Sequence, residues 1–311
     1  MFEQDFVPGY LKLHKTGELK QRGKILWEKM EKCDLCPRLC GANRLEGERG
    51  ICGADLELEI SSAHPHFGEE KPLVGDGGSG TVFLTHCNLK CVFCINWDIS
   101  HGGEGRRSSI DEFADIMLEL QKTGCSNINI VTPSHYSPHI FLALDLAASK
   151  GLTLPLVYNT CGWETTAVLG LLDGIVDIYL ADFKYFNNKN ASRYSLGAES
   201  YPEITQKALE EMNRQVGVAK PAADNLMKKG LMVRHLVMPD DVSGSKKVVD
   251  WMAKNLPKDT YLNLMSQYSP YYKAMDYPHI SRKITRKEYV EVIQHAKEVG
   301  LTNLEIQGYF N

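Results

Sequence analysis

The 311-residue sequence lacks the features that mark several classes of protein. No apolar run approaches the roughly 18 residues of a transmembrane helix, and the first five residues, Met-Phe-Glu-Gln-Asp, lack the positive charge of a secretory signal. There is no long basic block, and 35 basic against 39 acidic residues give a formal net charge of −4. We therefore expect a cytoplasmic protein with neither a membrane nor a nucleic acid as partner.

Cysteine, by contrast, is abundant. Nine cysteines occur, and most of them are clustered in the sequence. In a reducing compartment such clusters indicate metal binding rather than disulfide bonds. Cys125 and Cys161 stand alone, and we expect both to be buried as small apolar side chains. The two clusters are Cys33, Cys36, Cys40 and Cys52, and Cys87, Cys91 and Cys94.

The chain divides into two parts with different patterns. Residues 1–80 are loop-like and are expected to form a cysteine-rich N-terminal extension, whereas residues 81–311 alternate short aliphatic runs with helical patterns. This alternation predicts an α/β fold with a parallel sheet, either doubly wound or a β/α barrel. Capping boxes at Ser109–Glu112 and Thr285–Glu288 mark two helix starts. The expected strands are 81–85, 127–131, 154–158, 177–181, 231–237, 260–265 and 303–307.

The second cluster has the spacing C-x3-C-x2-C and follows the first expected strand. Three thiolates on one loop can hold three corners of a cubane iron–sulfur cluster, which leaves the fourth iron open to another ligand. A structural zinc site normally has four protein ligands, and the next candidate, His101, is seven residues past Cys94. Zinc, or three buried cysteines without metal, is the alternative interpretation.

This motif, with Phe93 before its last cysteine, resembles the hallmark of the radical S-adenosylmethionine (radical SAM) superfamily. The resemblance covers roughly residues 80–310 and implies a partial (β/α)6 TIM-like barrel. It also implies a 4Fe-4S cluster on Cys87, Cys91 and Cys94, with S-adenosylmethionine on the unique iron and Phe93 among the residues that bind the cofactor. An electron from a low-potential donor such as flavodoxin or ferredoxin would then cleave S-adenosylmethionine, and the 5′-deoxyadenosyl radical would abstract hydrogen from a substrate.

Two further motifs, Tyr158-Asn-Thr-Cys-Gly162 and Leu180-Ala-Asp-Phe-Lys184, resemble the pyruvate formate-lyase activating enzyme and its relatives with an extra cysteine-rich N-terminal segment. The resemblance implies that side chains after the third and fourth strands help to bind a monovalent cation beside the S-adenosylmethionine carboxylate. It also implies an arginine near the cofactor. A strand-end hydrogen bond or a surface ion pair is the alternative for each. The matching residues are Asn159, Thr160, Asp182 and Arg234.

One motif of the superfamily is missing. Members commonly carry Gly-Gly-Glu after the second strand, where the backbone receives the amine of S-adenosylmethionine, but this chain has Thr132-Pro-Ser-His135 there. Thr132, Ser134 and His135 are therefore the candidate replacement contacts. His135 is also a candidate catalytic acid or base, because histidine titrates near neutrality; a structural histidine is the alternative.

The N-terminal cysteines form a four-thiolate set in a segment with little hydrophobic core. Metal binding would supply folding free energy that burial cannot provide there. Cys33, Cys36, Cys40 and Cys52 suit zinc and an auxiliary 4Fe-4S cluster equally, and their spacing does not decide between them. Free thiols in a flexible segment are the alternative.

Three functions follow from these interpretations. The resemblance implies an activase that takes hydrogen from a backbone Cα of a partner protein to make a glycyl radical, and the open side of a partial barrel admits a peptide loop. Radical modification of a peptide side chain or of a small metabolite is the second hypothesis. A non-catalytic iron–sulfur or zinc scaffold, or an electron carrier, is the third.

Overall fold

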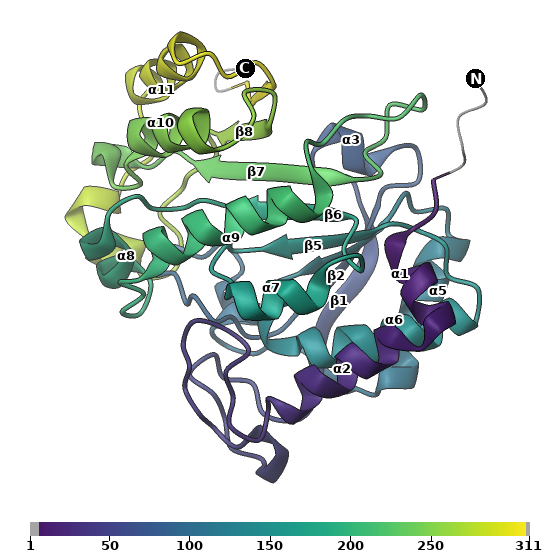
Figure 1. Ribbon diagram of the computed structural model, residues 1–311. Coiled ribbons are helices and arrows are strands. Elements are labelled where there is room, and N and C mark those ends of the chain that lie inside the picture. Colours follow the sequence, from purple (N-terminus) through teal and green to yellow (C-terminus); the bar gives the residue numbers. More distant parts are fainter. Residues whose placement is uncertain (1–5, 309–311) are drawn as a thin grey trace.

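A computed structural model describes residues 6–308, and in this range nine strands form a single sheet (Figure 1). The strand order is β3-β1-β2-β4-β5-β6-β7-β8-β9. Every neighbouring pair from β2 to β9 is parallel, whereas β1 is antiparallel to both β2 and β3. The strands are β1 Leu58–His66, β2 Ser79–Leu84, β3 Arg106–Ser108, β4 Ile128–Val131, β5 Leu156–Thr160, β6 Ile178–Asp182, β7 Gly230–Leu236, β8 Tyr261–Met265 and β9 Leu304–Ile306.

The sequence pattern predicted the parallel part of this sheet. All seven expected strands are confirmed, and their ends agree to within two residues. These strands are short runs of buried β-branched and aromatic side chains, as is typical of a parallel sheet covered on both faces. Residues 1–5, on which the argument against a secretory signal rests, lie outside the described residues.

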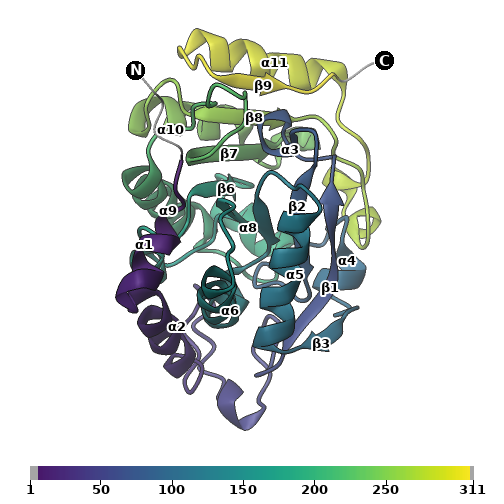
Figure 2. The same ribbon diagram turned by 90° about the vertical axis from the view of Figure 1, so that its right-hand side faces the viewer.

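The helices that connect the parallel strands pack around the outer face of the curved sheet (Figure 2). Both expected capping boxes are confirmed: Ser109 begins α5, Thr285 begins α11, and each exchanges hydrogen bonds with the glutamate three residues on. None of the helices within residues 6–308 has the length and hydropathy to cross a bilayer. The main helices are α5 Ile110–Lys122, α6 Ser137–Ser149, α7 Thr166–Leu172, α8 Asn188–Tyr194, α9 Tyr201–Val216, α10 Ser245–Asn255 and α11 Arg286–Glu298.

The first eighty residues are more ordered than the loop-like extension that the sequence predicted. Helices α1 (Gly9–Thr16) and α2 (Glu18–Glu28) precede the cysteines, and α2 packs along α6. Strand β1 and the short helix α3 (Lys71–Val74) follow them, and β1 extends the same sheet. Residues 31–57, which carry the first cysteine cluster, have no strand and no α-helix and contain a single 3-10 turn, Arg44–Glu46.

Asp177 links the start of the N-terminal helix α1 to the barrel by hydrogen bonds. Its Oδ1 accepts a hydrogen bond from Gly9 N and its Oδ2 accepts one from Leu156 N, each at 2.9 Å. A Cβ at Gly9 would lie 2.4 Å from Gly174 O, so the helix start approaches the barrel more closely than any larger residue allows. Burial raises the pKa of Asp177 to about 7.

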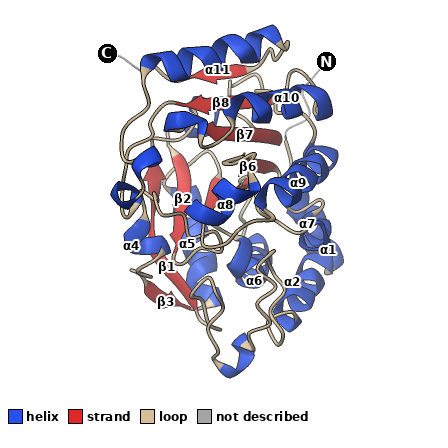
Figure 3. Cartoon of the chain, turned by 90° about the vertical axis from the view of Figure 1, so that its left-hand side faces the viewer, coloured by secondary structure: helices blue, strands red, loops and turns tan. Residues whose placement is uncertain are grey.

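The sheet is an open, partial barrel, with β3 and β9 at its two edges. Figure 3 looks onto the end where the parallel strands finish, and the short helix α4 (Trp97–Ser100) and α8 lie at this end. Parallel β/α folds place their chemistry at the carboxyl ends of the strands. The site is therefore expected at this end of the sheet.

Candidate active site

The three-cysteine loop follows β2 at the carboxyl end of the sheet. His86 and Lys90 adopt left-handed backbone conformations, with φ of 65° and 55°, and these turn the chain so that it coils tightly between the cysteines. Each cysteine sulfur accepts a hydrogen bond from the protein, and the sulfur of Cys94 also accepts a second one, from Asn96 N. The donors are Leu89 N to Cys87 at 3.4 Å, Ser195 Oγ to Cys91 at 3.3 Å, and Ser100 Oγ to Cys94 at 3.2 Å.

These donors fit a loop that holds three thiolates on a metal cluster. Hydrogen bonds to sulfur stabilise the charged form of a cysteine and tune the potential of the iron–sulfur cluster that it binds. Cys91 is buried, and Cys87 and Cys94 are partly exposed. The loop can thus hold a cluster whose exposed side is free for a further ligand.

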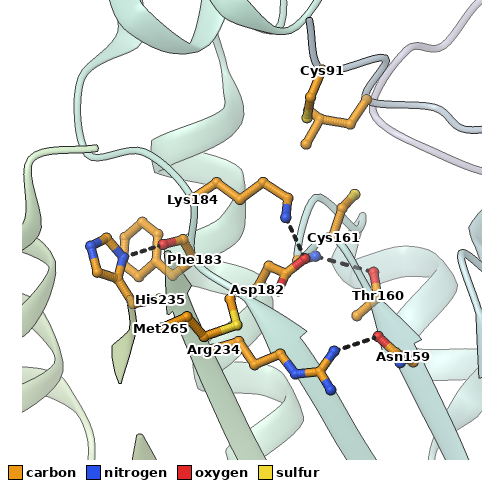
Figure 4. Close-up of polar contacts among 12 residues, drawn as sticks. Cys91, Asn159, Thr160, Cys161, Asp182, Phe183, Lys184, Arg234, His235 and Met265 are labelled. Carbon is orange, nitrogen blue, oxygen red and sulfur yellow. Dashed lines mark hydrogen bonds and ion pairs between the residues drawn. The ribbon is translucent and has the colours of Figure 1, made fainter. Parts of the chain in front are cut away.

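A largely buried lysine supplies positive charge beside the loop. Lys184 Nζ binds Asp182 Oδ2 at 2.6 Å, and Figure 4 shows its side chain between Cys91 and Asp182. Burial favours the neutral amine, but the carboxylate of Asp182 outweighs it and raises the pKa of Lys184 above its usual value. Burial also raises the pKa of Cys91 to about 12, and the charge of Lys184 opposes this rise. A permanent cation therefore faces the place of an anionic cluster.

Phe93 packs beneath the loop. Its ring makes edge-to-face contacts with Tyr185 and Tyr268, with ring centroids 6.2 and 5.8 Å apart. Phe93 is 6% exposed, so its ring is buried against other aromatic side chains and anchors the loop to the protein interior. Its expected role at the cofactor stays a prediction.

The candidate cofactor contacts come together at the ends of β5, β6 and β7 (Figure 4). Asn159 Oδ1 accepts a hydrogen bond from Arg234 Nη1 at 3.4 Å, and Asp182 accepts one from Lys184. Thr160 Oγ1 points the other way and donates to Glu164 at 2.5 Å. Arg234 and Lys184 thus contact the side-chain oxygens of Asn159 and Asp182. By the resemblance, these oxygens would bind a monovalent cation. That cation stays a prediction.

Arg234 is held by partners that the sequence did not indicate. Its guanidinium forms ion pairs with Glu69 and, through Nε at 2.6 Å, with Glu70, and Asn263 donates to Glu70 at 2.8 Å. Burial alone would raise the pKa of Glu70, but the charge of Arg234 lowers it below the usual value. Because the segment that precedes α3 crosses to β7 here, Arg234 is oriented from two sides.

The segment that replaces Gly-Gly-Glu turns inward rather than toward solvent. Thr132 has a left-handed φ of 60°, and its N–H donates to Asn159 O at 2.9 Å. Ser134 donates to Glu164, and His135 Nε2 bonds to Thr85 O at 2.9 Å. Burial moves the pKa of His135 well below its usual value. These are the contacts of the structural histidine that the sequence left as an alternative.

Glu164 is a site residue that the sequence reasoning missed. It is fully buried, its Oε1 accepts from the hydroxyls of Ser134 and Thr160, and its Oε2 has no partner among the described residues. Burial raises the pKa of Glu164 to about 7, although both hydroxyls oppose this. No local pattern marks it in the sequence: it stands between Trp163 and Thr165, four residues after the end of β5.

The four N-terminal cysteines lie on one compact loop. This loop packs against the three-cysteine loop that follows β2. Cys33 N donates to Ala42 O at 3.0 Å, and Gly41 N donates back to Cys33 O at 3.0 Å. Cys33, Cys36 and Cys52 are buried, and Cys40 is partly exposed. Within residues 6–308 no three His, Cys, Asp or Glu side chains are placed to bind a single metal ion, and this applies to both cysteine sets.

The two remaining cysteines are buried, as expected. Cys125 follows α5 and has Thr123 Oγ1 at 3.7 Å. Cys161 lies nearer the site: its thiol donates to Asn88 Oδ1 at 3.5 Å, and burial together with Cys87 raises its pKa well above the usual value. Neither belongs to a four-sulfur set.

Comparison with known proteins supports the interpretation of the three-cysteine loop. A family model described as the radical SAM superfamily matches residues 81–252. An uncharacterized protein of Methanocaldococcus jannaschii, MJ0674, is 32% identical over 277 residues, which cover 86% of this chain and 75% of that protein. A second uncharacterized protein of the same organism, MJ0808, is 23% identical over 283 residues, covering 83% and 77%.

Two solved structures align with part of the chain. A radical SAM methyltransferase from Sphaerobacter thermophilus aligns with a TM-score of 0.48 and 12% identity over 73% of this chain and 66% of that one. Methylornithine synthase (PylB) aligns with a TM-score of 0.46 and 12% identity over 73% and 70%. The family match covers more than half of the sequence and includes all three cysteines of the loop after β2. The chain therefore belongs to the radical SAM superfamily, whose members bind a 4Fe-4S cluster and S-adenosylmethionine.

Proposed function

We propose that this radical SAM protein is an activase that abstracts hydrogen from a backbone glycine of a partner protein. The observation that carries the proposal is a group of exposed apolar side chains beside the three-cysteine loop. Most enzymes that act on small metabolites enclose them in a cavity, whereas an exposed apolar patch beside a site is typical of a surface that receives a protein. We call this group the apolar surface, and it consists of Ile95, Trp97, Leu196, Tyr271 and Met275.

Three separate segments build the apolar surface. The indole of Trp97 stacks on Tyr272, with ring centroids 5.4 Å apart and planes 10° from parallel. Lys273 N donates to Val92 O at 3.0 Å, so the loop after β8 is bound to the cysteine loop. Val92 N in turn donates to Tyr194 O at 2.9 Å, which fixes the segment that carries Leu196. The surface is therefore part of the same rigid assembly as the cysteines.

The chain's own residues would have distinct tasks in this reaction. When bound, the cluster and S-adenosylmethionine supply the one-electron cleavage that generates a 5′-deoxyadenosyl radical. Cys87, Cys91 and Cys94 would hold the cluster, and Lys184 would balance its negative charge. Arg234 and Asp182, fixed by their ion pairs, would orient S-adenosylmethionine at the strand ends.

Other functions remain as alternatives to this proposal. Modification of a peptide side chain would use the same apolar surface, and a small metabolite would not need it. A metal-binding scaffold or electron carrier would use the cysteines without cleaving S-adenosylmethionine. A low-potential donor such as flavodoxin or ferredoxin would serve any of the enzymatic functions.

Isotope transfer tests the proposal. The anaerobically reconstituted enzyme is given S-adenosylmethionine, a strong reductant and candidate partner proteins labelled with α-deuterated glycine. We expect deuterium in the 5′-deoxyadenosine and a glycyl-radical EPR signal on the partner. Deuterium transfer from another labelled residue, or from a small metabolite, would refute the activase. Absence of 5′-deoxyadenosine under every condition would support the carrier.

A matched pair of variants tests the apolar surface. Met275→Glu places a charge on it, whereas Ile25→Glu places one on an exposed part of α2. We expect deuterium transfer from the partner to fall at least about tenfold in Met275→Glu, since about 1.4 kcal/mol of lost binding has that effect, and to be unchanged in Ile25→Glu. Equal rates in the two variants would contradict a docking role.

A further inference from the structure

The N-terminal cysteines carry the local features of metal ligands. The main-chain amides of Leu35, Arg38 and Ala54 donate hydrogen bonds to the sulfurs of the cysteines two residues earlier, Cys33, Cys36 and Cys52. Leu89 N makes the same contact to Cys87 in the first loop. Amides that donate to sulfur stabilise a thiolate, which is the form that binds metal.

The four sulfurs also face a common space. Cys33 and Cys52 each interact with Cys40, and Cys36 interacts with both Cys33 and Cys52. The sulfurs of Cys40 and Cys52 both border Gly50. The segment thus folds its thiols inward, although it contains almost no regular secondary structure.

Gly50 keeps that space open. A Cβ at this position would lie 3.2 Å from Cys52 Sγ and 3.4 Å from Cys40 Sγ. Gly50 is not among the glycines with positive φ, so its backbone conformation does not require glycine. The requirement is room between two sulfur atoms, and a larger residue would intrude on whatever they bind.

Arg44 directs positive charge at the same thiols. It is fully buried; its Nε donates to Asp55 O at 2.8 Å and its Nη1 to His135 O at 2.6 Å. Nη2 has no hydrogen-bond partner among the described residues. The guanidinium contacts the sulfur of Cys33 and interacts electrostatically with Cys52. A buried cation is costly unless an anion faces it, and a thiolate-bound metal centre is such an anion.

Two further cations lie between the two cysteine sets. Arg38 binds Asn88 O at 2.7 Å and Leu89 O at 3.2 Å, and its charge interacts with both Cys36 and Cys87. Lys90 interacts in the same way with Cys52 and Cys87. The two sets are therefore neighbours that share compensating charge.

We propose that Cys33, Cys36, Cys40 and Cys52 hold a second 4Fe-4S cluster, placed directly beside the loop that holds the first. A zinc site would need all four sulfurs at about 2.3 Å from a single ion. In a 4Fe-4S cluster each sulfur binds a different iron, so the four sulfurs can lie farther apart, as the three sulfurs of the radical SAM loop also do. A site beside a redox centre also suits a redox-active metal. This inference does not depend on the glycyl-radical proposal.

The second cluster gives the chain another one-electron centre. One electron from a reduced flavodoxin or ferredoxin converts a 4Fe-4S cluster from its 2+ to its 1+ state, and no bond or proton moves. The donor is oxidised by one electron in the same step.

Metal analysis of the whole protein is the first test. After anaerobic reconstitution we expect about eight iron and eight sulfide per chain, from two four-iron clusters, and no stoichiometric zinc. The triple variant Cys87→Ala/Cys91→Ala/Cys94→Ala should keep about four iron, and Cys33→Ala/Cys36→Ala should also keep about four. Cys125→Ala, which changes a buried cysteine outside both sets, should keep all eight. About four iron with one zinc in the unaltered protein would overturn the proposal.

EPR spectroscopy tests the placement of the two centres. Two reduced clusters that share Arg38 and Lys90 should give a spectrum broadened by spin–spin interaction, and each single-cluster variant should lose the broadening. A spectrum equal to the sum of the two separate spectra would refute adjacency.

A pair of glycine variants tests the site without removing a ligand. Gly50→Ala places a methyl group between two sulfurs, whereas Gly170→Ala adds one where no atom lies within 4 Å. We expect iron to fall from about eight to about four per chain only in Gly50→Ala. Unchanged iron in Gly50→Ala would contradict a cluster in this space.

Discussion

The two cysteine sets are held by different means. The loop after β2 is attached to a parallel strand and α4, and hydroxyls from Ser100 and Ser195 reach its sulfurs. Residues 31–57 have no strand, and buried or half-buried guanidinium groups hold them by donating to carbonyl oxygens. The first set is thus positioned by the sheet and the second by charge.

This difference means that the two sets should respond differently to the same kind of change. A backbone scaffold places the ligands before the metal arrives, whereas a segment with little core gains much of its folding free energy from the metal itself.

The largest effect is expected from Cys91→Ala. This change removes a ligand from the sheet-held set, so production of 5′-deoxyadenosine from S-adenosylmethionine should fall below detection. Cys125→Ala is the control, since that cysteine has no place in either set. Chromatographic quantification of 5′-deoxyadenosine decides the matter, and undiminished turnover in Cys91→Ala would disprove the assignment of the first set.

Arg44→Met should destabilise the charge-held set. The change leaves the carbonyl oxygens of Asp55 and His135 without donors, which costs about 2–4 kcal/mol in the free energy of unfolding. Arg214→Met is a matched control because Arg214 makes only exposed ion pairs, and it should change little. Urea unfolding of chelator-treated protein measures both, and equal losses would show that the buried arginine does not hold the segment.

Asp177 provides a pH-dependent attachment of the same N-terminal region. Its pKa is raised to about 7 in the folded protein, so the folded state retains a proton that the unfolded chain has released above about pH 4. The free energy of unfolding should therefore fall as pH rises from about 4 to about 7, by about 4 kcal/mol at most.

The pH dependence of the free energy of unfolding, rather than its absolute value, distinguishes the unaltered protein from Asp177→Asn. Asp177→Asn loses one acceptor at every pH but has no proton to release, so its stability should vary less between pH 5 and pH 8. Urea unfolding at several pH values gives both slopes, and parallel slopes would rule out this attachment as the source of the pH dependence.

The smallest effect is expected from Ser100→Ala. The change removes a hydrogen bond to Cys94, so the reduction potential of the first cluster should become more negative while its iron content is kept. Ser149→Ala, at the exposed last residue of α6, should leave the potential unchanged. An EPR-monitored redox titration reads both, and an identical potential in both variants would argue against tuning by Ser100.

The sequence revealed the parallel strands but not the whole sheet. The seven parallel strands are apolar runs between helix signals, so their pattern is strong. Strand β1 contains Pro65 and mixes buried with exposed side chains, and β3 has only three residues. Strands such as β1 and β3 are stabilised by pairing with a neighbouring strand, and the local sequence pattern does not reveal that pairing.

The same reason separates the site residues that were predicted from those that were missed. The cysteines were found because their spacing is local. Glu70 pairs with Arg234 across 164 residues, and Arg38 binds carbonyls 50 and 158 residues away. Such contacts are produced by the fold, and a buried acid such as Glu164 is recognisable only when the surrounding side chains are known.

The long reach of Arg38 also has a consequence for biosynthesis. Two of its acceptors, Ser195 O and Leu196 O, lie 157 and 158 residues further along the chain. A ribosome adding about 5–20 residues per second needs roughly 10–30 s to produce them. The four N-terminal thiols therefore leave the ribosome well before their docking site exists. That interval is a window in which a metallochaperone could reach them from solvent, before the loop after β2 covers one side.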